Sequence, residues 1–386
     1  MKAKALRQNL KNNFTKYALV VELLVIFVLF EALTGGLYIT STNMTNLLMQ
    51  GCTFAIIGIG MVPVMVAGYI DLSAGAALGF LATAAATMEV RLGLSAPVTI
   101  VLTLVLGLFI GCWNGYWIAY RHIPAFIATL AGQLVFKGLT LLVGEGVGIG
   151  PMSDGFSAPG RSFLPSVFFK NDVSILFLAL VIALLFVKTF RSRKARERYE
   201  LPVPPLKKDL GRLAVITIAL AAVGSILILY RGIPYAIVLL VVLAAAVTFA
   251  CKNTQFGRSV YAIGGNREAT RLSGISLERS SFKIFMLMGL VTAVASIVYL
   301  GRIGQATAQT GQNFEFSAIT GCIVGGTSTL GGSGTIVGAI IGTIMMASLD
   351  NGMSMLNLGN TYQYITKGLV LLFAVALDIA SKKGES

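Results

Sequence analysis

The sequence predicts an all-α fold, a polytopic bundle of transmembrane helices, and three observations lead to this prediction. Of the 386 residues, 56% are hydrophobic and only 12% are charged, and the mean hydropathy is +0.82, more apolar than a soluble domain. The 43 glycines, about 11% of the chain, exceed the usual ~7% and suit helices that pack closely in a membrane. The apolar residues also form long runs between short polar segments.

Division of these runs by the ~20 residues that cross a bilayer predicts about twelve membrane segments within one domain, residues 1–386. In chain order they are 17–33, 46–67, 72–90, 97–119, 125–144, 173–190, 213–230, 234–251, 282–301, 316–330, 334–349 and 361–380. The tenth and eleventh are short enough to be half-helices or re-entrant pieces, so we expect short or broken helices in the bundle.

The 30 Lys and Arg residues are divided unevenly between the two sides of this arrangement. With the N-terminus inside, 23 lie in cytoplasmic segments, five lie outside, and Lys137 and Lys367 fall within spans. Because cytoplasmic loops carry the excess of positive charge, both termini are predicted to be cytoplasmic. The net charge of +14 follows this topology and forms no basic face of a soluble domain, so we expect no nucleic-acid partner.

Two polar connections between spans are long. Residues 191–209 are basic and proline-bearing, which fits a tether beside anionic lipid headgroups, with contact to a partner as the alternative. Residues 145–172 form a glycine-rich outer loop, which fits either an extracytoplasmic partner or a mobile connection.

Residue types that catalyse reactions or bind metals are scarce. His122 is the only histidine, and the four cysteines lie far apart in apolar stretches, so we expect no metal site. No stretch matches the phosphate loop G-x-x-x-x-G-K-[ST], so the chain is expected to lack an ATPase site and to bind no cofactor directly. Dispersed carboxylates form no recognisable acid and base pair, which argues against an intramembrane enzyme.

Glycine patterns indicate close packing and a weak internal repeat. Residues 58–79 and 321–342 each contain an apolar segment, a short polar break and a helix of small residues. Since broken helices of transporters lie near the substrate path, Asp71, Ser73, Gly326 and Thr327 are candidate pathway residues. Four GxxxG pairs are also present, and we favour packing within one subunit for each: Gly75 with Gly79, Gly111 with Gly115, Gly321 with Gly325, and Gly338 with Gly342.

Several charged and polar residues fall inside or beside the predicted spans. Asp71 is expected to cap the third span, and Lys137 and Lys367 to reach the headgroups. Asp350 and Asn351 follow the eleventh segment, where they either contact sugar hydroxyls or, as we favour, end a helix.

The cytoplasmic loop of residues 252–281 contains start and stop signals for a short helix. Gly264 and Gly265 predict a turn, Asn266 a helix cap, Arg267 to Ser273 two helical turns, and Gly274 a left-handed stop. Such a helix offers a lever to a soluble partner, whereas an amphipathic loop on the membrane surface is the alternative. The residues expected to contact that partner are Gly264, Gly265, Asn266, Arg267, Glu268, Ala269, Arg271, Leu272 and Gly274.

Four motifs in order carry a family resemblance over almost the whole chain: GYIDLSAG at 68–75, FGRSVYAIGGNREATRLSGI at 256–275, IVGGTSTLGGSGTIVGAIIG at 323–342 and LDNGMSML at 349–356. The chain resembles the permeases of ribose-, xylose- and galactose-type ABC importers. It is most similar to the xylose and multiple-monosaccharide permeases, which also carry two extra spans with a basic loop, here residues 173–230. In this family Tyr69 is commonly Glu and Ala74 commonly Val, so any role tied to that Glu is in doubt for this chain.

The resemblance implies a homodimeric pathway for a monosaccharide, xylose or another simple sugar, in a bacterial cell membrane. It further implies a sugar-binding protein outside and a separate ABC ATPase inside, which holds the ATP and docks on the 264–274 segment as its coupling helix. An ion-coupled secondary transporter is the alternative, because twelve spans also suit that class.

Overall fold

The computed structural model of the chain describes residues 19–383, and for residues 381–383 it describes the backbone alone. The basic residues before the first span, residues 17 and 18 of that span, and the side chains of Lys382 and Lys383 therefore lie outside the described residues. Within them, the regular structure is helical, with two isolated β-bridges between loops.

A first helix over residues 19–33 is followed by a series of α-helices and two π-helical turns. These are α2 (Ser41–Val66), α3 (Ala74–Ala86), η1 (Thr87–Arg91), α4 (Ala96–Gly115), η2 (Tyr116–Tyr120), α5 (Ala125–Gly144), α6 (Asp154–Arg161), α7 (Asp172–Arg198), α8 (Leu206–Tyr230), α9 (Tyr235–Asn253), α10 (Gln255–Gly265), α11 (Arg267–Leu272), α12 (Leu277–Ile303), α13 (Phe314–Val324), α14 (Ile336–Met355) and α15 (Asn360–Lys383).

Each of the twelve predicted segments coincides with helix, and the polytopic all-α fold is confirmed. Among the described residues, nine helices are long and apolar enough to cross a membrane. The tenth segment is the short α13 of 11 residues, as expected. The eleventh is not a half-helix, because α14 continues to Met355 and reaches 20 residues, enough for a full crossing.

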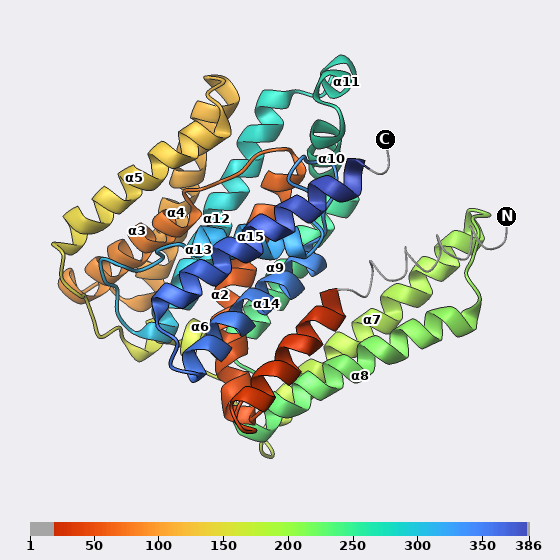
Figure 1. Cartoon of the computed structure of the whole chain (residues 1–386), viewed down its shortest axis with the longest axis horizontal. Coiled ribbons are helices and arrows are strands. Elements are labelled where there is room, and N and C mark those ends of the chain that lie inside the picture. The colour runs from red at the N-terminus through yellow and green to blue at the C-terminus, as the bar shows by residue number, and fades with distance from the viewer. Residues whose placement is uncertain (1–18, 384–386) are drawn as a thin grey trace.

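Three helices form the centre of the bundle. In their apolar stretches 89% of the residues of α2, 72% of α12 and 61% of α14 are buried by the rest of the chain. A helix that is apolar on all sides belongs in such a position. In the peripheral helices α7, α8 and α15, 17% or less of the residues of the apolar stretch are buried. Figure 1 shows α7 and α8 as a hairpin at one side of the bundle.

The four GxxxG pairs pack against other parts of the same chain, as favoured from the sequence. Gly321 and Gly325 face Gly338 and Gly342, so that a Cβ on any of the four would meet the opposite backbone or Thr343. The two halves of this contact come from α13 and α14, which explains how the short α13 is held in the bundle.

The predicted outer loop of residues 145–172 is not a simple mobile connection. It contains α6, whose Phe156 is fully buried and whose Gly160 lies against the backbone of α12 near Val298 and Gly301. Ser157 within it is only 5% exposed.

Segments that were predicted to be cytoplasmic gather at one end of the molecule. In Figure 1, α10, α11, the end of α15 and the connection between α7 and α8 all point to the same side, away from α6. The charge pattern predicts that these segments share one side of the membrane. That this side is the cytoplasmic one stays a prediction.

Candidate functional site: a short helix joined to two helix breaks

The short helix predicted in the 252–281 loop is present as α11. Asn266 precedes it, and its side-chain oxygen accepts a hydrogen bond from the Ala269 amide at 2.9 Å. Gly274 has a φ of +80°, a left-handed conformation that glycine adopts without steric cost. Both end signals read from the sequence are therefore confirmed as local geometry.

The predicted turn at Gly264 and Gly265 is wrong, because both residues belong to the last turn of α10. They differ in surroundings. A Cβ at Gly264 would overlap the carbonyl oxygen of Val66 and touch the amide nitrogen of Gly332, whereas a Cβ at Gly265 would meet nothing within 4 Å. Gly264 is thus required by close approach of three backbone segments and not by a turn.

Two helix breaks meet at Gly264. The first lies between α2 and α3, and the second is the loop between α13 and α14. The Gly332 amide donates to the carbonyl oxygen of Val66 at 2.8 Å, and the Tyr261 hydroxyl donates to the carbonyl oxygen of Gly334 at 2.7 Å. The α10 helix therefore contacts both breaks of the weak internal repeat.

The α11 helix is tied to the first break through Arg267. Its Nη2 donates to the hydroxyl oxygen of Tyr69 at 2.7 Å, and its guanidinium lies 5.3 Å from the centre of the Tyr69 ring. The same hydroxyl lies 2.8 Å from Ser281 Oγ on α12. Tyr69 is 6% exposed whereas Arg267 is exposed, so the contact joins a buried phenol to an arginine at the surface. In this chain a phenol receives the arginine.

The outer surface of α11 is free to meet another molecule. Leu272 is 79% exposed, an unusual position for a leucine beyond the apolar spans. Glu268 and Arg271 form an ion pair at 2.6 Å, but both side chains are about two-thirds exposed, so the pair contributes little stability. Ala269 and Glu268 are also exposed, while Thr270 is buried toward the bundle.

A cavity of about 530 Å³ lies beside this contact. Tyr69 and Arg267 line it together with His122 and the apolar residues at the start of α5. A smaller cavity of about 180 Å³ also contains His122 and Arg267, and adds Arg271 and Glu278.

Asp71 and Ser73 lie in the first break, but Asp71 is not the helix cap that the sequence predicted. Ser73 precedes α3, and its own side chain makes no capping bond. Asp71 Oδ1 accepts from the Ser73 amide at 2.8 Å and from the Ser73 hydroxyl at 2.6 Å. Asn114 on α4 donates to Ser73 Oγ at 2.9 Å, which joins the break to a third helix.

Glu315 is a buried acid that the sequence analysis missed. It is 1% exposed, and its Oε1 accepts from Gln133 Nε2 at 2.7 Å. A Cβ at Gly75 would overlap Glu315 Oε2, so the first glycine of a GxxxG pair makes room for a carboxylate. The signal in the sequence was a single Glu near the start of a short apolar segment, and it did not identify a partner.

Asp350 and Asn351 do not end a helix, because both lie within α14. Asp350 Oδ2 pairs with Lys367 Nζ at 2.8 Å, and the side chains are 5% and 14% exposed. Lys367 therefore meets a buried carboxylate, and the prediction that it reaches the headgroups is wrong. Asn351 and Asn43 exchange two hydrogen bonds of 3.0 Å.

The pathway candidates occupy separate places. Thr327 is 1% exposed in the second break, and its hydroxyl has no hydrogen-bond partner within residues 19–383. Gly326 beside it is exposed with a φ of +86°. The structure does not bring these residues together with Asp350 and Asn351, and in the described part of the chain no three His, Cys, Asp or Glu residues are grouped to hold a metal ion.

Comparison with known proteins identifies the family. Residues 43–375 match the family described as branched-chain amino acid transport system / permease component. The chain belongs to this permease family. With nine candidate spans within residues 19–383, it is a multi-pass protein of the bacterial cell membrane, as predicted.

The permease is 40% identical over 374 residues to the xylose transport system permease protein XylH of Haemophilus influenzae. This alignment covers 96% of this chain and 98% of the relative. It is 40% identical over 373 residues to XylH of Escherichia coli, covering 96% and 93%. The ribose import permease protein RbsC of Bacillus subtilis is 34% identical over 358 residues, covering 92% and 90%. No solved structure matches the chain. The resemblance to sugar ABC permeases that the four motifs carried is thus confirmed.

Proposed function

We propose that this permease forms the membrane pathway of an ABC importer for xylose or a similar simple sugar. It works with a second copy of itself, a separate ATPase on the α11 side, and an extracytoplasmic sugar-binding protein at the other side. ATP is held by the ATPase, and the permease needs no cofactor of its own.

The observation that carries this proposal is the contact of α10, at Gly264 and Tyr261, with both helix breaks. A partner that pushes on α11 acts through Arg267 on Tyr69 and through α10 on the loop at Gly332, so one movement reaches both helix breaks. Exposed Leu272 offers that partner an apolar anchor beyond the membrane spans. The contacts support the expected coupling role of residues 264–274.

The sugar follows from the relatives and not from the family name, which refers to branched-chain amino acids. Two relatives with 40% identity over nearly full length carry names of xylose transport, and a third is named for ribose import. Sequence identity over nearly the full length supports a sugar of this kind more strongly than a family description does.

The test is reconstitution of the tagged permease together with the subunits that accompany it from its own membranes. In liposomes, the complex is expected to take up radiolabelled xylose when ATP is supplied on the α11 side, and to take up no leucine. The permease alone, under a proton or sodium gradient, is expected to take up neither. Gradient-driven xylose uptake without an ATPase would favour the secondary transporter instead, and leucine uptake would overturn the sugar assignment.

A further inference from the structure

The hairpin of α7 and α8 takes no part in the proposed coupling through α10 and α11, and its helices are longer than a bilayer requires. These helices have 27 and 25 residues, more than the ~20 that cross a bilayer. Residues 173–190 of α7 are largely apolar and span roughly 27 Å, close to the ~30 Å of the hydrocarbon core. The last two turns of α7 and the first two of α8 therefore project into the headgroup layer.

This projecting tip, residues 188–212, carries nine cations and three acids. Eight of the cations are exposed and form no ion pair with any acid among the described residues. They are Lys188, Arg191, Lys194, Arg196, Arg198, Lys207, Lys208 and Arg212.

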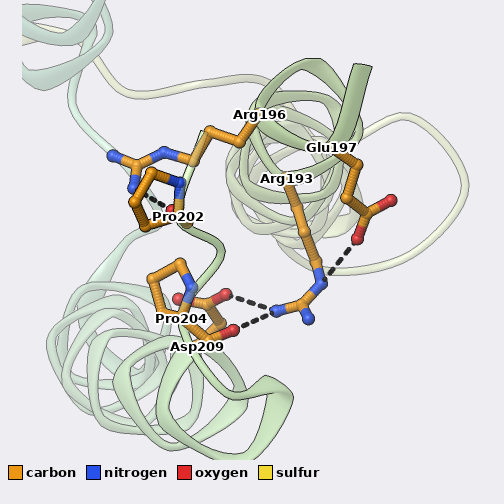
Figure 2. Close-up of polar contacts among 6 residues, drawn as sticks. All are labelled: Arg193, Arg196, Glu197, Pro202, Pro204 and Asp209. Atoms are coloured by element: carbon orange, nitrogen blue, oxygen red, sulfur yellow. Dashed lines mark hydrogen bonds and ion pairs between the residues drawn. The ribbon is translucent and has the colours of Figure 1, made fainter. Parts of the chain in front are cut away.

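The ninth cation, Arg193, pairs with two of the three acids, so these acids do not neutralise the exposed cations (Figure 2). Its Nη1 lies 2.8 Å from Asp209 Oδ2 on α8, and its Nε lies 3.5 Å from Glu197 Oε1. Arg193 is the one half-buried cation of the tip, with a side chain 22% exposed. Only Glu200 remains unpaired in the described tip, so the exposed surface is almost entirely positive.

The turn between the helices is rigid. Pro202, Pro204 and Pro205 fix their own φ angles, and two arginines donate to the carbonyl oxygens of Pro202 and Pro204. Arg193 Nη1 donates to Pro204 at 2.8 Å, and Arg196 Nη1 donates to Pro202 at 3.3 Å (Figure 2). A rigid tip holds its cations in place before any ligand arrives, which lowers the entropic cost of binding.

The cations continue an exposed apolar face of α7. Leu176, Leu180 and Leu184 are 53% to 68% exposed and follow each other at four-residue spacing. Lys188 is the next residue of this row, and Arg191, Lys194 and Arg198 follow on the same face at ~100° per residue. Arg193 lies on the opposite side of α7, toward α8. One face therefore changes from apolar to cationic where the hydrocarbon ends.

We propose that the tip of the α7 and α8 hairpin binds the headgroups of anionic phospholipids. An acidic protein would match the charge but not the continuous row of leucines below it, whereas a phospholipid provides an acyl chain for the leucines and a phosphate for the cations. Only 6% of the α7 apolar stretch is buried by protein, which leaves this face open to the acyl chains of such lipids.

The test uses the full-length permease, purified with equal amounts of phosphatidylglycerol and phosphatidylcholine and measured by native mass spectrometry. The wild type is expected to retain phosphatidylglycerol preferentially. The variant Lys188→Gln/Arg191→Gln/Lys194→Gln/Arg198→Gln should lower the retained ratio by at least ~10-fold, given about 1 kcal/mol per basic residue near an anionic surface. The control Lys252→Gln/Arg258→Gln/Arg279→Gln/Lys283→Gln removes the same charge from α9, α10 and α12, outside the hairpin tip, and should change the ratio by less than about 2-fold.

Arg193 provides a second test that leaves all eight exposed cations in place. Arg193→Gln releases Asp209 and Glu197 to compete for them and should lower the ratio, while adding Glu197→Gln and Asp209→Asn should restore it. Equal losses in the quadruple variant and its control, or no preference in the wild type, would overturn the proposal. Displacement of the lipid by millimolar inorganic phosphate would indicate a soluble anion site. An unchanged ratio with loss of the co-purifying ATPase would indicate a protein contact.

Discussion

At the scale of single residues, charges inside the bundle are matched to partners from distant parts of the sequence. Lys367 on α15 meets Asp350 on α14, and its Nζ also lies 5.7 Å from the ring of Phe54. A charge in such surroundings is costly without its counter-ion, so each partner accounts for the presence of the other.

Replacement of Asp350 by Leu is expected to destabilise the permease, because it leaves the Lys367 ammonium buried without a counter-ion. For one-sided loss of a buried pair the cost is about 3 to 5 kcal/mol. Thermal unfolding in detergent should show a clear decrease in the midpoint. The double variant Asp350→Leu/Lys367→Met should recover most of it, and a single variant as stable as wild type would show that the pair is not buried in the native protein.

A second residue-scale prediction concerns Tyr69. Tyr69→Phe keeps the ring beneath Arg267 but removes the hydroxyl that joins α11 to α12, a loss of about 1 kcal/mol per hydrogen bond. In the reconstituted complex we expect more ATP hydrolysed per sugar transported. Ser281→Ala, which leaves the bond from Arg267 intact, is the control and should have the smaller effect; equal coupling in all three proteins would exclude Tyr69 from transmission.

At the scale of elements, α10 and α11 are held in place by a few specific contacts. Helix α11 has only six residues and is held by a cap at Asn266 and by Arg267, since a helix this short is not stable alone. Its neighbour α10 fits between the two breaks because Gly264 has no side chain.

The two adjacent glycines at the end of α10 allow a matched comparison. Gly264→Ala adds a methyl group where Val66 and Gly332 leave no space, so it should displace α10 from both breaks and abolish ATP-driven uptake. Gly265→Ala adds the same group in open space and should leave uptake near wild type. Uptake and membrane abundance are measured for both, and equal activities would contradict the close approach at Gly264.

At the scale of the whole molecule, the bundle surrounds α2, α12 and α14 and leaves α7, α8 and α15 with mostly apolar, exposed surfaces. This distribution suits a protein whose outer surface faces lipid. Positively charged loops at the end that carries α11 predict that this end is cytoplasmic.

Cysteine labelling in intact cells tests that orientation. With Cys112, the one native cysteine that is not fully buried, replaced by Ala, cysteines at Ser192 and Ser273 should be protected from an impermeant maleimide, while one at the exposed Lys170 should react. Ser157 is unsuitable as the outer position, because it lies within α6 and is only 5% exposed. The opposite labelling pattern would invert the topology.

The sequence by itself determined the features that depend on neighbouring residues. Long apolar runs predicted the helices because each must cross the same hydrocarbon thickness, and Asn266 and Gly274 predicted the ends of α11 because capping acts within four residues. The four motifs determined the family, since they preserve order and spacing along the chain.

Only the tertiary structure decided which distant groups meet. Asp350 and Asn351 were expected to end a helix, but α14 continues through them because Lys367 and Asn43 satisfy their side chains. Tyr69 was noted only as a departure from the family until Arg267, 198 residues away, was found on its hydroxyl. In an apolar medium a polar group must find a partner wherever the fold supplies one, and hydrophobic periodicity contains no information about that choice.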